Sequence, residues 1–177
     1  MFNIGQWIAI EETDPRGRAL YERHYSTHRY RDHRRITRFV GPGEPMVLLT
    51  PESDALFVWR KFIDASGQRG INCAIFRNEG PRLSSALIFE ADDLAWQKWP
   101  GERLYTYVNA GKIRSTNPGY CFIKAGWQRC GFTKGGLIVL ECYPANFRSD
   151  STAPSSSVPS RSSKVSETPY CPTLALI

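Results

Sequence analysis

Alternating and helical spacings of apolar residues predict short elements at the start of the chain. The stretch 7–11, Trp-Ile-Ala-Ile-Glu, alternates and predicts a first strand with one face in the core. Asp14 followed by Pro15 is typical of an N-cap with proline at the first helical position. We therefore expect a helix from Pro15 to about residue 28, with Leu20 on the same face as His24.

Three apolar runs, at 46–50, 55–62 and 71–76, predict an antiparallel meander of three strands, because turn-forming residues separate them. A turn follows residue 76, and a helix is expected from the Ser84-Ser85 pair to the Pro100-Gly101 stop. The residues expected on its apolar face are Leu83, Leu87, Leu94 and Trp96.

The remaining elements are a strand at 104–109, a short helix at 117–125 and a hairpin of strands 127–133 and 137–143. The composition then changes, and residues 148–177 form a Ser/Pro-rich tail that is expected to be disordered. The pattern predicts one α+β domain at residues 1–147, with a mixed, mostly antiparallel sheet flanked by helices.

Composition is that of an ordinary globular protein. Of the 177 residues, 41% are hydrophobic, which is enough for a substantial core. The five cysteines are scattered without any C-x-x-C pair, which favours a reducing compartment. No signal-peptide pattern opens the chain and no apolar run is long enough to span a bilayer, so a cytoplasmic protein without membrane contact is expected. A dimer is compatible with the sequence, but no feature predicts the oligomeric state.

Positive charge is concentrated between residues 16 and 38. This segment holds eight arginines against two acidic residues, an excess equal to the net charge of +6 of the whole chain. Arginines interleaved with tyrosines suit contact with phosphates and stacking on bases. The residues predicted to bind double-stranded DNA are Arg29, Tyr30, Arg31, Arg34, Arg35 and Arg38. A solvated basic surface is the alternative interpretation.

All three histidines, at positions 24, 28 and 33, fall in this same segment. A metal site could use His24 and His28, one helical turn apart, as first ligands, but the sequence supplies no third ligand at a suitable spacing, so no metal site is predicted. Acid–base chemistry is the other interpretation, since His24 lies next to Tyr25. A third interpretation is that the histidines only contribute to a nucleic-acid-binding surface.

The turn after residue 76 has the residue types of an anion site. Arg77, Gly80 and Arg82 surround the helix start at Ser84 and Ser85, where backbone N–H groups and guanidinium groups could meet at a phosphate. An ordinary turn with solvated arginines is the alternative.

The order of elements resembles the GNAT superfamily of N-acetyltransferases. In that superfamily the corresponding turn follows R/Q-x-x-G-x-G/A and its backbone amides hold the pyrophosphate of acetyl-CoA. The stretch 77–82, Arg-Asn-Glu-Gly-Pro-Arg, is similar through Arg77 and Gly80, with Arg82 replacing the last glycine. Gly126-Trp127 is similar to a second motif, a Gly-Phe pair. The resemblance implies binding of an acyl-CoA-like donor by Arg77, Asn78, Gly80, Arg82, Ser84 and Ser85.

The superfamily's frequent general acid, a tyrosine, falls on Phe122 here, and Tyr120 is the substitute candidate. Within the superfamily, His24-Tyr25 together with Arg77 is similar to phage Mom-type proteins, which modify adenine bases in phage DNA and protect it from host restriction. This resemblance implies a transferase acting on the exocyclic amine of adenine, located in the host cytoplasm, with His24, Tyr25 and Tyr120 as candidate catalytic residues. The alternatives are an acyl-CoA N-acetyltransferase of a small amine or protein, and a non-catalytic DNA-binding or host-inhibiting module.

Overall fold

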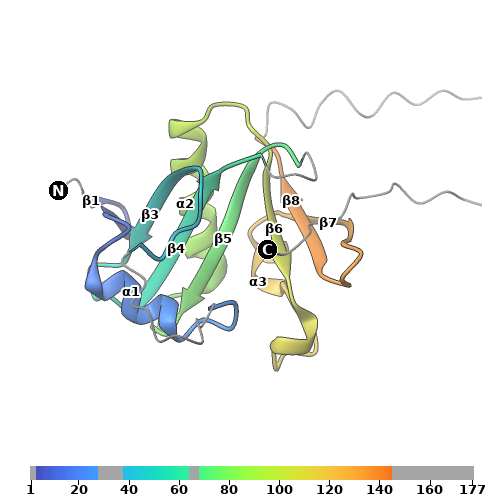
Figure 1. Cartoon of the computed structure of the whole chain (residues 1–177), viewed down its shortest axis with the longest axis horizontal. Helices are drawn as coiled ribbons and strands as arrows, with labels where there is room; N and C mark the ends of the chain where they lie inside the picture. The colour runs from blue at the N-terminus through green and yellow to red at the C-terminus, as the bar shows by residue number, and fades with distance from the viewer. Residues whose placement is uncertain (1–2, 28–37, 64–67, 145–177) are drawn as a thin grey trace, which may run out of the picture.

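Eight strands form one mixed sheet in the computed structural model, which describes residues 3–27, 38–63 and 68–144 (Figure 1). The strands are β1 (Asn3–Ile4), β2 (Trp7–Ile10), β3 (Glu44–Leu49), β4 (Ala55–Lys61), β5 (Ile71–Asn78), β6 (Leu104–Val108), β7 (Gln128–Phe132) and β8 (Ile138–Cys142). Their order across the sheet is β1-β2-β3-β4-β5-β6-β8-β7. Neighbours are antiparallel except β5 and β6, which are parallel. The predicted α+β class and the three-strand meander are confirmed.

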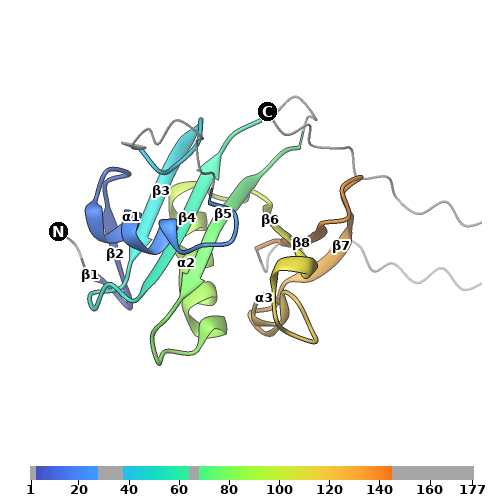
Figure 2. The ribbon, with the colours of Figure 1, turned by 60° about the horizontal axis from the view of Figure 1, so that its bottom comes forward.

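Helices cover both faces of this sheet. Helix α1 (Pro15–Glu22) lies on one face and α2 (Ser84–Lys98) on the other, as Figures 1 and 2 show. A 3-10 turn, η1 (Ala110–Lys112), and the short helix α3 (Tyr120–Lys124) follow β6. The predicted tail at 148–177 lies outside the described residues, and so does the end of the predicted domain after residue 144.

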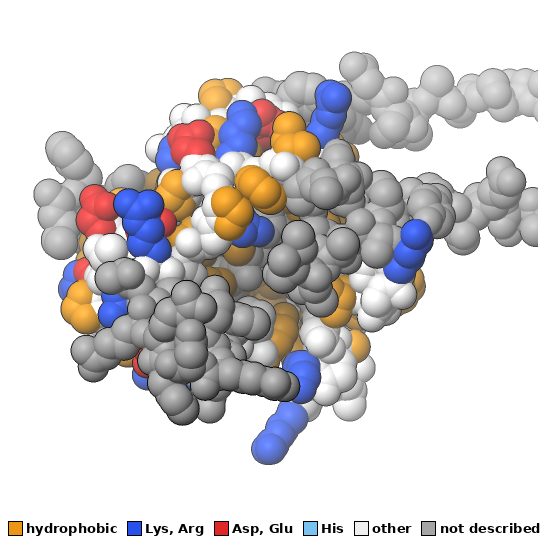
Figure 3. Space-filling view, viewed as in Figure 1, with side chains coloured by type: hydrophobic (Ala, Val, Ile, Leu, Met, Phe, Trp, Pro, Cys, Tyr) orange, Lys and Arg blue, Asp and Glu red, His pale blue; other side chains and the backbone are white. Residues whose placement is uncertain are grey.

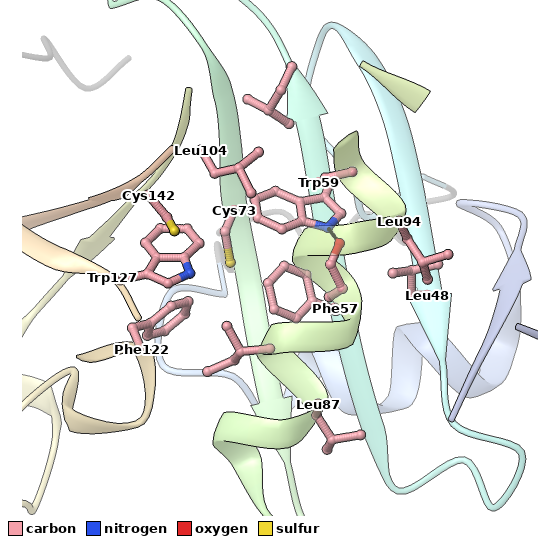
Figure 4. Close-up of a cluster of buried hydrophobic side chains, with 14 of the residues drawn as sticks. Leu48, Phe57, Trp59, Cys73, Leu87, Leu94, Leu104, Phe122, Trp127 and Cys142 are labelled. Atoms are coloured by element: carbon pink, nitrogen blue, oxygen red, sulfur yellow. Dashed lines mark hydrogen bonds between the residues drawn. The ribbon is translucent and has the colours of Figure 1, made fainter. Parts of the chain in front are cut away.

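Each face of the sheet has its own hydrophobic core. The larger core lies between the sheet and α2, and Figure 4 shows Phe57, Trp59, Cys73 and Trp127 packed there. Two buried indoles are also hydrogen bonded to this helix: Trp7 Nε1 donates to the Leu87 carbonyl at 2.9 Å and Trp59 Nε1 to the Ala91 carbonyl at 3.0 Å. The smaller core, under α1, contains Leu20, Phe39 and Ile75. Helix α2 and the central strands therefore form the rigid part on which the site is built.

Three local predictions differ from the structure. The first predicted strand is β2, and it packs on both faces, because Trp7 joins the core under α2 while Ile8 joins the core under α1. Helix α1 ends at Glu22 and not near residue 28, since the chain leaves the helix through a turn at Arg23. Leu83, expected on the buried face of α2, precedes the helix as its N-cap and is 71% exposed.

Candidate functional site

A cleft opens where the two parallel strands separate. Pairing between β5 and β6 covers only their first three residues and ends at Cys73 and Thr106, although β5 continues to Asn78 and β6 to Val108. Figure 1 shows the strands close together at one end and apart at the other. The resulting cavity has a volume of about 350 Å³.

A bulge in β5 accounts for the separation. Trp59 pairs with Cys73 and Val58 with Ile75, which leaves Ala74 as an extra residue in β5. A bulge bends a strand and increases its twist. Because this one follows directly on the last residue paired with β6, it turns the rest of β5 away from its parallel neighbour.

Aromatic side chains form a large part of the walls of the cleft. The chain just after α1 contributes His24 and Tyr25 to the lining. The sheet contributes Cys73, Ala74, Phe76, Thr106, Tyr107 and Val108, and the segment after β6 contributes Ile113, Ser115, Asn117, Gly119, Tyr120, Cys121 and Phe122. Six of them carry aromatic rings. A mostly apolar cleft with a few hydroxyl and imidazole groups is the usual composition of a small-molecule site.

His24 is buried at one side of this cleft, with only 8% of its surface exposed. Its Nδ1 lies 2.7 Å from Ser26 Oγ and also accepts a hydrogen bond from the Ser26 backbone N–H at 3.3 Å. Burial is the main cause that lowers the pKa of His24 from 6.5 to about 4; the nearby charge of Arg77 acts in the same direction, and a hydrogen bond to the Phe76 backbone opposes the shift. His24 is therefore neutral at pH 7, and in this conformation its imidazole is a weak base.

Tyr25 extends from the end of α1 across the cleft. Its ring lies 4.3 Å from that of His24 between centroids, and its hydroxyl is hydrogen bonded to the backbone of Asn109, just beyond β6. Burial is the main cause that raises the pKa of Tyr25. His24 contacts β5 and Tyr25 contacts the end of β6, so the predicted His-Tyr pair bridges the two separated strands.

The third candidate catalytic residue, Tyr120, is the first residue of α3 and lines the same cleft as Phe122. Helical spacing alone predicts that the two side chains diverge, but α3 has only five residues and both reach the cavity. Two thiols also line it, and burial raises the pKa values of Cys73 and Cys121, which keeps both protonated at neutral pH.

Sequence reasoning missed the contributions of β6 and of the segment before α3. The three consecutive hydroxyl residues Tyr105-Thr106-Tyr107 carried a signal for a polar strand, but only the tertiary structure shows that Thr106 and Tyr107 line the cleft. No local pattern distinguishes Ser115 or Asn117 from ordinary turn residues.

Arg77 lies at the end of β5, close to His24. The guanidinium of Arg77 already has hydrogen-bond partners within the protein. Arg77 Nε donates to Glu79 Oε1, and its Nη1 donates to the backbone carbonyl of Arg23. Arg23 binds the same carboxylate with two hydrogen bonds, from Nε at 2.8 Å and from Nη2 at 2.7 Å. Hydrogen bonds from Arg23 and Arg77 lower the pKa of Glu79 to about 2. One carboxylate thus bridges two arginines from different parts of the chain.

The remaining residues predicted to hold a donor are spread over the β5–α2 turn and the start of α2. Asn78 Nδ2 donates to Ser84 Oγ at 3.0 Å, and Asn78 Oδ1 accepts the backbone N–H of Gly80 at 3.0 Å. Arg82 pairs with Glu52 at 2.8 Å. Ser85 follows Ser84 in the first turn of α2 and is partly exposed. The Gly80 amide therefore points into the turn, where Asn78 holds it, and not toward an external anion.

Of the residues predicted to bind DNA, only Arg38 is described. Its side chain is 74% exposed, and its guanidinium pairs with Glu12 at 3.0 Å. The others, Arg29, Tyr30, Arg31, Arg34 and Arg35, lie outside the described residues. On the face drawn in Figure 3, the described Lys and Arg side chains are scattered among acidic and apolar ones.

Within the described ranges, no group of three or more His, Cys, Asp and Glu side chains could hold a metal ion. His28, the possible second ligand beside His24, is outside those ranges. No helix in the described part of the chain is both long and apolar enough to cross a bilayer.

The fold and the cleft define an α+β domain with a mixed sheet that splits between two parallel strands. Comparison with protein-family models, with curated proteins and with solved structures finds no match for this chain. The function must therefore be argued from the cleft itself.

Proposed function

We propose that this protein is a transferase that modifies the exocyclic amine of adenine in DNA, as the resemblance to phage Mom-type proteins implies. The observation that carries the proposal is the cleft between β5 and β6, with His24 in its wall and Arg77 close to His24. Such a cleft can bring a donor and a planar base together while excluding water, which is the main requirement when the nucleophile is a weak aryl amine.

The proposed donor is acetyl-CoA or a similar acyl carrier. The apolar walls formed by Phe76, Val108 and Phe122 fit its extended acyl arm. Its phosphates would be held by Arg77 and the start of α2 at Ser84 and Ser85, since the Gly80 amide is occupied by Asn78. When bound, this group supplies an activated carbonyl carbon to the amine.

The acceptor base would enter the cleft after leaving the DNA stack, and tyrosines at the entrance suit stacking on it. Tyr25 and Tyr120 are 41% and 47% exposed, so part of each residue is accessible to a substrate. Both carry a hydroxyl, and that of Tyr25 is hydrogen bonded to the Asn109 backbone. We assign proton transfer to these two hydroxyls. His24, with both its ring nitrogens engaged, acts as a positioning residue that holds Tyr25 through ring contact.

Mass analysis of nucleosides tests the proposal. DNA from cells expressing the protein is digested, and modified adenosine is compared between wild type, Tyr25→Phe, Tyr120→Phe and Arg77→Ala. We expect wild type to yield a modified adenosine and Arg77→Ala to reduce it at least tenfold. Tyr143→Phe, which removes a phenol hydrogen bonded to Glu141 outside the cleft, is the matched control and leaves the yield unchanged.

Absence of any modified nucleoside with the wild-type protein would contradict the proposal. In that case, steeply salt-dependent DNA binding would identify a non-catalytic DNA-binding module.

A small amine is the second candidate acceptor. It is favoured by the pairing of the described arginines near the cleft, since Arg23 and Arg77 share Glu79 while Arg82 pairs with Glu52. Little free positive charge then remains on this part of the surface to attract a nucleic acid. Titration calorimetry distinguishes the two candidate functions. Binding of acetyl-CoA without binding of DNA would favour the small-amine acetyltransferase.

A further inference from the structure

The carboxylate of Glu79 lies between Arg23 and Arg77, and the hydrogen-bond donors around it are arranged as in a site for an oxyanion. Arg23 comes from the end of α1 and Arg77 from the end of β5, and Figure 2 shows these two ends lying near each other. Both guanidinium groups direct N–H donors at one carboxylate, and Arg23 does so with a two-pronged contact. Carboxylate and phosphate oxygens bind the guanidinium fork in the same way.

Arg77 is held in place independently of Glu79. Arg77 Nη1 also donates to the backbone carbonyl of Arg23, which ties the end of β5 to the end of α1. An anion that replaces the Glu79 carboxylate would therefore meet a guanidinium that already has a fixed position.

The Glu79 carboxylate can be displaced without a change in the backbone. Its side chain is 31% exposed, and it lies in the turn between β5 and α2, where its backbone N–H donates to the Asp54 carbonyl at 2.8 Å. A rotation of the side chain alone would take the carboxylate into solvent while the turn stays in place. Three charge-assisted hydrogen bonds hold the carboxylate, so an oxyanion that offers the same two-pronged acceptor geometry, such as a phosphate, is the kind of ligand that can compete with it.

We propose that Arg23 and Arg77 form a phosphate-binding pair and that Glu79 is an internal anion that blocks it until a phosphate group displaces the carboxylate. The inference rests on the proposed function for the role of Arg77 and adds Arg23 as a second ligand and Glu79 as an autoinhibitory contact. The ligand is a phosphate oxyanion, supplied either by the pyrophosphate of the donor or by the backbone of DNA.

The test is binding of inorganic pyrophosphate to the full-length protein, measured by titration calorimetry. We expect Glu79→Gln to bind pyrophosphate at least tenfold more tightly than wild type, and Glu79→Ala to do the same. Glu102→Gln is the matched control: it removes one negative charge from an exposed pair with Lys61 and should stay within twofold of wild type. Adding Arg23→Gln to Glu79→Gln should abolish the gain.

A second series, with a short DNA duplex at fixed salt concentration, identifies the source of the phosphate. If the Glu79 variants bind only pyrophosphate more tightly, the Arg23–Arg77 pair binds the donor. If they bind only the duplex more tightly, the pair binds the DNA backbone. If both Glu79 variants stay within twofold of wild type for both probes, or if Glu102→Gln gains equally, the inference is wrong. These readouts need no catalysis, so absence of modified adenosine would overturn the proposed function and leave this inference standing.

Discussion

The Nδ1 atom of His24 faces the hydroxyl and the backbone N–H of Ser26, at 2.7 Å and 3.3 Å. Because a backbone N–H can only donate, Nδ1 is the acceptor, and the ring proton belongs on Nε2. The remaining hydrogen bond of the ring, to the Phe76 backbone, is then made by Nε2. This arrangement fixes the tautomer of a histidine that links the turn after α1 to strand β5.

The pKa of His24 gives a first prediction. Its value is about 4 in the folded protein against 6.5 for an ordinary histidine, so between these values the unfolded chain binds a proton that the folded chain does not. Stability should therefore decrease as the pH falls from about 6.5 to about 4, and less so in His24→Gln. Thermal unfolding of both proteins at pH 7.5 and pH 4.5 measures the difference, and NMR of the imidazole measures the pKa directly. A His24 pKa above 6 would contradict the prediction.

The buried carboxyl of Asp92 should make the stability of the fold depend on pH in the opposite direction to His24. Its carboxyl is 2% exposed beneath the sheet, where Oδ2 accepts a hydrogen bond from Trp127 Nε1 at 2.7 Å and Oδ1 has no hydrogen-bond partner among the described residues. Burial raises the pKa of Asp92 well above its usual value. A raised pKa stabilises the fold at low pH, and this contribution is lost as the pH rises.

Asp92→Asn keeps an acceptor for Trp127 but cannot ionise. We expect the melting temperature of Asp92→Asn relative to wild type to rise steadily between pH 5 and pH 9, as measured by circular dichroism. Asp93→Asn, at the neighbouring exposed position of α2, removes a charge that also raises the pKa of Asp92, so it should show a weaker trend of the same sign. A constant difference for Asp92→Asn would show that the buried carboxyl ionises as freely as an exposed one.

Leu87 and Leu83 test the packing of α2. Leu87 is fully buried in the larger core, whereas Leu83 is exposed at the N-cap. Leu87→Ala should lower the free energy of unfolding by about 2–5 kcal/mol, the usual cost of a cavity left by a buried leucine. Leu83→Ala should change it by less than about 0.5 kcal/mol. Denaturant unfolding measures both, and equal losses would mean that the helix packs through the wrong face.

Gly119, at the start of α3, tests the wall of the cleft. Its φ of +81° is unfavourable for other residues, and a Cβ atom there would lie 2.8 Å from Leu140 Cδ1. Gly119→Ala should therefore cost about 1–3 kcal/mol of unfolding free energy. Gly111→Ala is the control, because the nearest atom to a Cβ at that position is 3.4 Å away, and its effect should be small. If Gly119→Ala leaves the free energy of unfolding unchanged, α3 shifts readily to make room for the added methyl group.

Local sequence patterns determined much of the secondary structure. The Asp14-Pro15 pair predicted the start of α1, and the apolar runs separated by turns predicted the strands of the meander. These features depend on interactions between near neighbours in the chain, such as capping, fixed backbone angles and alternation of side chains. That is why they can be read without knowledge of the rest of the molecule.

Only the tertiary structure decided the site. The bulge at Ala74, the separation of β5 from β6 and the meeting of Arg23, Arg77 and Glu79 all join segments far apart in the sequence. The pattern 77–82 showed arginines beside a glycine, but it could not show that Glu79 pairs with Arg77 and that Glu52 pairs with Arg82. Charge pairing and strand separation depend on which elements become neighbours, and that is settled by the packing of the whole domain, not by any local stretch.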